Sequence, residues 1–158
     1  MHRVRVSWKL LQRAVLLGVL IGALVPGVAV AETGNVLHSF LSGANVVPGP
    51  GADKASGLAT VIASQPSTIC AMVTASGVGD APSAHIHQGV AGTEGPIVVS
   101  LLPMVAGSSS GCVHDVDRGL IVDMAKHPEQ YYVAVHDAAH PSGAVRGQLA
   151  KRGGYGLL

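Results

Sequence analysis

Hydrophobic and polar residues alternate over short segments through most of the chain after residue 35, as they do in β-strands with one buried face. Gly, Pro, Ser and Asp separate these segments, which predicts turns between them. We predict strands over residues 36–41, 57–64, 68–75, 83–87, 96–102, 131–136 and 144–149. Strands so closely spaced predict an all-β fold, an antiparallel β-sandwich of about seven to eight strands with Greek-key-like connections.

One segment, residues 117–126, follows a helical period instead. Leu120, Ile121 and Met124 fall on one face, Asp117 is suited to cap the start, and Pro128 follows the end. We therefore predict one short helix that crosses between strands of the sandwich.

The first 31 residues have a different pattern. A basic segment is followed by an uncharged apolar run over residues 14–25, then by Pro26-Gly27 and the small residues Ala29 and Ala31. This order is typical of a secretory signal peptide, with cleavage expected after Ala31. The alternative, a membrane anchor, calls for about 20 uninterrupted apolar residues. We expect a secreted, extracytoplasmic product, with one domain over residues 36–149 and a flexible tail over residues 150–158.

Removal of the leader changes the charge. Four of the ten basic residues lie in it and all nine acidic residues follow it, so the remaining chain has a net charge of −3 with histidine neutral. A nucleic-acid partner would require a basic stripe, and none is present. The expected partner is an unknown extracellular ligand or envelope component, with membrane contact only through the signal peptide during export.

Two cysteines, Cys70 and Cys112, follow the leader. A pair of cysteines in an oxidising compartment predicts one disulfide bond. The alternative, a redox or metal-binding pair, would normally have the C-x-x-C spacing, which is absent here.

Histidine is concentrated in the exported part, which holds seven of the eight. In Ala84-His85-Ile86-His87 the two-residue period of a strand places both imidazoles on one face. The same period places His136 opposite the core face of its own strand, and His140 follows in a short connection. Arg146 lies on the polar face of the next strand.

Neutral imidazole is a preferred ligand of copper and zinc, so His85, His87 and His136 form a candidate three-histidine metal site, with His140 as a weaker candidate. This prediction requires that two strands distant in sequence be neighbours. In the alternative interpretation the histidines form a hydrogen-bonded polar network that holds the turn at residues 89–96 against residues 138–143, with no metal.

The segments in this order resemble the CHRD domain, a module named after chordin and found in bacterial secreted proteins. The resemblance covers about residues 36–149. It is carried by residues 41–48 (Leu-Ser-Gly-Ala-Asn-Val-Val-Pro), 84–92, 95–99, 132–136, 139–143 and 146–149 (Arg-Gly-Gln-Leu). It implies a secreted or cell-surface β domain with a binding or structural role. Val145 departs from the family, which usually has an acidic residue there.

The histidine pattern also looks like the copper side of Cu/Zn superoxide dismutase. That likeness implies copper bound by His85, His87 and His136, with Arg146 as a catalytic residue that attracts a small anion. The bridging-histidine loop and the zinc-binding aspartate of that family are not recognisable. The sequence thus favours an extracytoplasmic binding or structural module that is a candidate for metal, with a copper-dependent redox enzyme as the alternative.

Overall fold

The computed structural model describes residues 35–80 and 82–151, and the predicted signal peptide lies outside this part. All strand pairings are antiparallel and belong to one sheet with the order β5-β4-β7-β8-β1-β2-β3-β6, while β9 pairs with β1. The strands are β1 (Asn35–Ser42), β2 (Ser56–Ser64), β3 (Thr68–Ser76), β4 (Ser83–Gln88), β5 (Ile97–Ser100), β6 (Ser108–Val113), β7 (Tyr131–His136), β8 (Val145–Gln148) and β9 (Ala150–Lys151).

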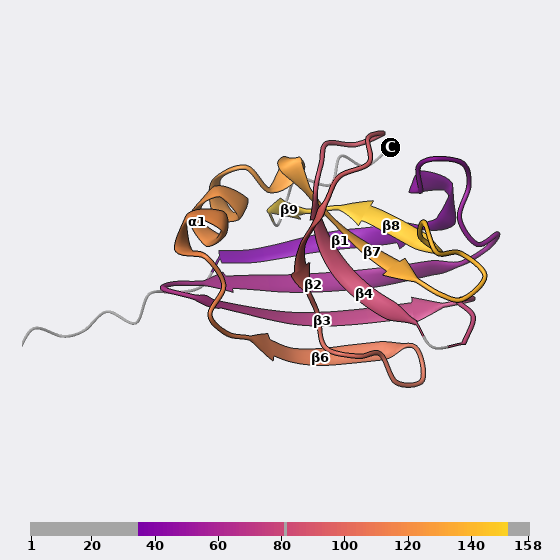
Figure 1. The fold of residues 1–158 in the computed structure, drawn as a ribbon, viewed down its shortest axis with the longest axis horizontal. Helices are drawn as coiled ribbons and strands as arrows, with labels where there is room; N and C mark the ends of the chain where they lie inside the picture. Colours follow the sequence, from indigo (N-terminus) through magenta and orange to yellow (C-terminus); the bar gives the residue numbers. More distant parts are fainter. Residues whose placement is uncertain (1–34, 81, 152–158) are drawn as a thin grey trace, which may run out of the picture. The chain divides into compact units, whose positions relative to one another are not determined.

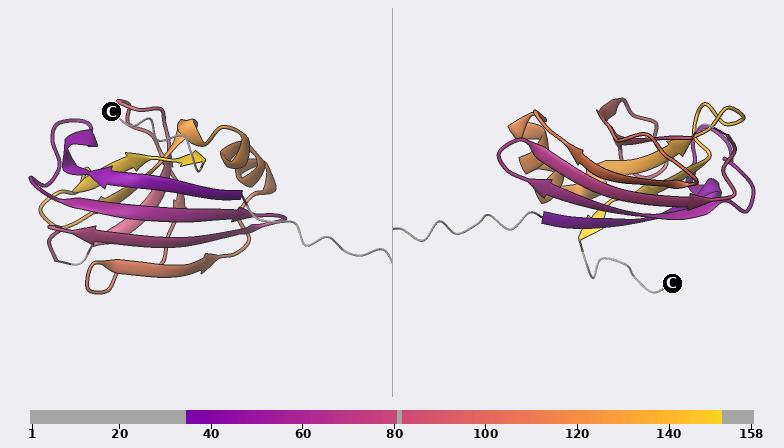
Figure 2. Two further views of the ribbon diagram at one scale, coloured as in Figure 1. Left: turned by 180° about the vertical axis from the view of Figure 1, so that it is seen from behind. Right: turned by 90° about the horizontal axis from the view of Figure 1, so that it is seen from below.

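The sheet curls on itself into a nearly closed, barrel-like pair of layers. Figure 1 shows β4 crossing obliquely in front of β2 and β3, with β7 beside it, and Figure 2 shows the same arrangement from behind and from below. The two halves meet where β8 joins β1 at the pair Ser42 and Arg146. Gly147 allows this close approach, because a Cβ atom there would lie 2.1 Å from the carbonyl oxygen of Phe40. The predicted all-β antiparallel fold is confirmed.

The core lies between the two layers and is built from alternate residues of each strand. One layer contributes Leu37, Val61 and Val73, and the other contributes Ile86 and Val133, all fully buried. The opposite faces of β4 and β7 are therefore directed away from the core. His85, His87 and His136 lie on these outer faces.

The predicted helix is confirmed as α1 (Arg118–Lys126), which connects edge strand β6 to β7 in the other layer. The Asp117 carboxylate accepts a hydrogen bond from the Leu120 amide, as an N-cap residue does. Ile121 and Met124 are buried in the core. Two 3₁₀ turns, η2 (Gly43–Asn45) and η3 (Pro128–Gln130), complete the secondary structure of the described residues. Among these residues, no helix combines the length and hydrophobicity of a membrane span.

Two strands differ from the sequence prediction. β6 was not predicted, because Ser108-Ser-Ser-Gly-Cys-Val113 lacks a hydrophobic alternation. It forms because β3 offers it a partner over six residues. Ala150 and Lys151, which we assigned to a flexible tail, pair with His38 and Leu37 of β1.

The disulfide prediction is confirmed. Cys70 of β3 and Cys112 of β6 lie directly opposite each other, with Cα atoms 3.9 Å apart, and their sulfur atoms are bonded. Disulfide bonds persist in oxidising compartments, so this bond indicates an extracytoplasmic environment.

The side chain of Tyr131 on β7 links the sheet to helix α1. Its hydroxyl donates a hydrogen bond of 2.5 Å to the carboxylate of Asp123 on α1, and the ring is almost fully buried. Burial, and then the bond to Asp123, raise the pKa of Tyr131 well above its ordinary value. We expect Tyr131→Phe to lower the free energy of unfolding at pH 7 by about 1 to 3 kcal/mol, measured by urea denaturation.

Because the pKa of Tyr131 is raised in the folded protein, the contribution of its hydroxyl to the free energy of unfolding depends on pH. A group whose pKa is higher in the folded state than in the unfolded state stabilises the fold fully below the unfolded value, about 10 for tyrosine. The contribution disappears as the pH rises above that value. The gap in stability between the wild type and Tyr131→Phe should therefore shrink above pH 10. A gap that stays constant at alkaline pH would contradict the prediction.

Candidate metal centre

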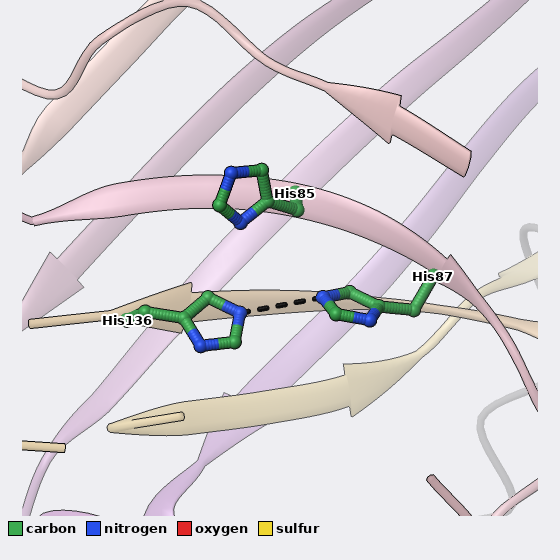
Figure 3. A group of neighbouring side chains, drawn as sticks. All are labelled: His85, His87 and His136. Carbon is green, nitrogen blue, oxygen red and sulfur yellow. Dashed lines mark hydrogen bonds between the residues drawn. The ribbon is translucent and has the colours of Figure 1, made fainter. Parts of the chain in front are cut away.

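The adjacency of β4 and β7 brings the three predicted histidines together. In the register of this pair, His85 lies opposite Ala134, His87 opposite Tyr132 and His136 opposite Ser83. His136 and His87 therefore approach each other along the strands, over the short side chain of Ala134. His85 lies beside them (Figure 3). The ring centroids are 5.2 Å apart for His85 and His136, 5.4 Å for His87 and His136, and 6.1 Å for His85 and His87.

One nitrogen of each ring is directed to a common point, and the three nitrogens lie within 4.8 Å of one another. The Nε2 atoms of His87 and His136 are 3.3 Å apart. Zinc–nitrogen bonds of about 2.0–2.1 Å in a tetrahedral site imply ligand atoms about 3.3–3.4 Å apart. The separation of this one pair matches that value, whereas the group of three as a whole lies within 4.8 Å. The third ring, His85, directs a nitrogen to the other two (Figure 3), and its buried Nδ1 has no hydrogen-bond partner.

Two backbone carbonyls assign the tautomers of His87 and His136. The Nδ1 atom of His87 donates to the carbonyl of Gly95 at 2.9 Å, and that of His136 donates to the carbonyl of Pro141 at 3.0 Å. A neutral imidazole that carries its proton on Nδ1 has a lone pair on Nε2. The close Nε2 atoms therefore present two lone pairs to each other, and a cation or a proton between them would relieve the repulsion.

The environment favours the neutral, metal-binding form of two of these rings. Burial lowers the pKa of His85, and the neighbouring His136 and His87 lower it further. Burial also lowers the pKa of His87, which is only 7% exposed. The hydrogen bond to Gly95 acts in the opposite direction, whereas the charges of His136 and Arg146 reinforce the lowering. Because a metal binds the deprotonated imidazole, these shifts keep the lone pairs available near neutral pH.

Two loops hold the carbonyl partners in place. In the 89–96 loop, Gly95 comes so close to β4 that a Cβ atom there would lie 1.6 Å from the carbonyl oxygen of Gln88. Only glycine allows this approach, which places the Gly95 carbonyl at His87. Gln148 donates to the carbonyl of Gly89 at 2.6 Å and so anchors the start of the loop.

The 137–143 loop is organised by the buried carboxylate of Asp137. It accepts hydrogen bonds from the backbone amides of Gly79, Ala139 and His140 and from Nδ1 of His140. Burial alone would raise the pKa of Asp137, but the hydrogen bonds from Gly79 and His140 outweigh it and hold the pKa below its ordinary value. His140, the weaker candidate ligand, thus pairs with Asp137. Within the described residues it lies outside the group of three.

The family model described as CHRD domain matches residues 37–149. The chain belongs to the CHRD family. No curated protein and no solved structure gives a match. The matched range agrees with the predicted resemblance, and this CHRD domain contains the three histidines together with the carbonyl partners of His87 and His136.

Arg146, the predicted catalytic residue of the redox alternative, is engaged inside the CHRD domain. It is 3% exposed, and its guanidinium donates to the carbonyls of Thr93 and Val90 at 2.6 and 2.9 Å. The guanidinium carbon lies 3.5 Å from the centroid of the Tyr132 ring. These contacts occupy the group that would attract an anion, and the likeness to superoxide dismutase stays a prediction.

The sequence pattern indicates the three histidines but not the residues that orient them. Gly95, Pro141 and Asp137 act through backbone carbonyls and a buried carboxylate, which have no recognisable spacing in the sequence. Tyr132 had a signal, because the strand period placed it on the same face as His136. It stacks on His87 with centroids 4.7 Å apart and planes 12° apart.

Proposed function

We propose that this CHRD domain binds one transition-metal ion through His85, His87 and His136. The observation that carries the proposal is the convergence of three imidazole nitrogens, two of them held with the lone pair directed inward by backbone carbonyls. A metal ligand histidine commonly donates its other ring N–H to such a partner. A purely structural network would be expected to satisfy the buried Nδ1 of His85, which has no partner among the described atoms.

The donor set favours copper or zinc. Imidazole suits both metals, whereas calcium and magnesium prefer oxygen ligands. Neither cysteine is available as a thiolate, since both are in the disulfide. Copper(II) generally binds such sites more tightly than the other divalent first-row metals. We therefore propose copper as the ion bound with the highest affinity.

We further propose that the domain acts as a secreted binding or envelope-associated module. The disulfide and the predicted signal peptide support a location outside the cytoplasm. The net charge of −3 after the leader favours an extracellular ligand or envelope component over nucleic acid as the partner.

The test is a metal titration of protein produced by export and stripped with a chelator. We expect the N-terminus at Glu32 and one equivalent of Cu(II) bound per chain, measured by calorimetry and elemental analysis. His127→Ala is the matched control, because His127 is an exposed histidine beyond the end of α1. It should bind copper as the wild type does. Metal content at background after exposure to copper and zinc would refute the proposed function.

A further inference from the structure

Arg146 is a buried cation, and among the described residues no carboxylate lies at hydrogen-bond distance from its guanidinium. Its guanidinium instead connects three parts of the domain: strand β8, the 89–96 loop and the Tyr132 ring. The loop and the Tyr132 ring both contact His87, one of the three candidate metal ligands.

The first path runs through the loop. Arg146 fixes the carbonyls of Val90 and Thr93, which lie five and two residues before Gly95. The Gly95 carbonyl accepts the Nδ1 hydrogen of His87, and its amide donates to the Tyr132 hydroxyl at 3.2 Å. The planar guanidinium can hold two carbonyls at once in a fixed geometry, which the ammonium group of lysine does not reproduce.

The second path runs through ring stacking. Tyr132 makes ring contacts with both Arg146 and His87, and its plane is nearly parallel to that of His87. Both paths therefore restrain the position and the plane of one imidazole.

We propose that Arg146 is a positioning residue of the metal site, which fixes the His87 imidazole through the 89–96 loop and Tyr132 rather than by contact with a bound ion or an anion. This inference rests on the proposed metal-binding function and assigns Arg146 a role within it.

If Arg146 acts only through its charge, its removal should raise the metal affinity. If it acts by positioning His87, its removal should lower the metal affinity. A guanidinium repels a metal cation, so a residue that acted only by its charge would weaken binding, and its removal would strengthen it. A positioning residue strengthens binding, and substitution of groups that orient a ligand commonly costs 10- to 100-fold in metal affinity.

The experiment compares Arg146→Lys and Arg146→Met with the wild type in Cu(II) affinity and in the electron paramagnetic resonance spectrum of the copper-loaded protein. Lysine keeps the charge and loses the planar contacts, whereas methionine loses both. We expect both variants to bind Cu(II) about 10-fold more weakly and to show altered copper hyperfine parameters, since the His87 ligand moves. Tyr131→Phe is the control for lost stability on β7, and its affinity and spectrum should equal those of the wild type.

The outcomes separate this inference from the proposed function. No copper binding by the wild type would refute the site itself. Wild-type affinity and spectrum in Arg146→Lys, or tighter binding by Arg146→Met, would overturn the positioning role and leave the site intact. If neither Arg146 variant folds, Tyr132→Phe decides, because it removes the hydroxyl that contacts Gly95 and keeps the ring. Unchanged affinity and spectrum in Tyr132→Phe would then overturn the inference, and weaker binding with an altered spectrum would support it.

Discussion

Replacement of His136 by alanine is expected to lower the Cu(II) affinity of the protein by more than about 100-fold. Loss of residues that merely orient a ligand already costs 10- to 100-fold, and His136 supplies a ligand atom itself. His136 is only partly buried, so its truncation leaves the core intact. The variant loses one hydrogen bond, to the Pro141 carbonyl, which is expected to cost the metal-free protein about 1 kcal/mol.

The same variant distinguishes a metal site from a histidine network. Bound metal stabilises the folded state by about 2.7 kcal/mol at a free concentration 100 times the dissociation constant. The wild type should therefore gain thermal stability when copper is added, and His136→Ala should gain little. His127→Ala again serves as the control and should respond as the wild type does. If copper stabilises His136→Ala and the wild type equally, the ion binds elsewhere.

Removal of the disulfide is expected to give the largest loss of stability. The bond joins cysteines 42 residues apart in sequence and ties edge strand β6 to β3. A disulfide that closes a loop of this length restricts the unfolded chain and so stabilises the folded state by up to about 4 kcal/mol. Disulfides commonly stabilise proteins by about 2–4 kcal/mol. We expect the double variant Cys70→Ala/Cys112→Ala to lose stability in that range by urea denaturation.

Two controls accompany this prediction. Reduction of the wild type should produce the same loss, whereas the double variant should not respond to reductant. The copper affinity of the double variant should remain that of the wild type, because the disulfide joins β3 to β6 whereas the histidines lie on β4 and β7. A loss of less than about 1 kcal/mol would show that the pairing of β6 with β3 does not depend on the covalent bond.

Local sequence patterns correctly predicted the features that depend on residues close together in the sequence. The two-residue period of a strand placed His85 and His87 on one face, and Asp117 with the apolar residues after it predicted the helix. The number of cysteines predicted the disulfide, since Cys70 and Cys112 are the only two in the chain. These features follow from backbone geometry and composition, which the sequence carries directly.

Features that depend on long-range pairing were predicted incompletely or not at all. β6 has little hydrophobic pattern of its own and is defined by its pairing with β3. His136 can meet His87 only if β7 lies beside β4, and the two histidines are 49 positions apart in the sequence. The strand period placed Arg146 on the polar face of its strand, but it could not show that the guanidinium is buried and holds the 89–96 loop.

The all-β class, the helix, the cysteine pair, the CHRD resemblance and the three candidate histidines could all be read from the amino-acid sequence. The convergence of these histidines, the ring nitrogen of His87 and His136 that carries the lone pair, and the burial of Arg146 became visible in the folded chain. Strand alternation is a local property of the backbone, so it can be read from a short segment. The positions of carbonyls, rings and charges around a site depend on which distant strands and loops pack together.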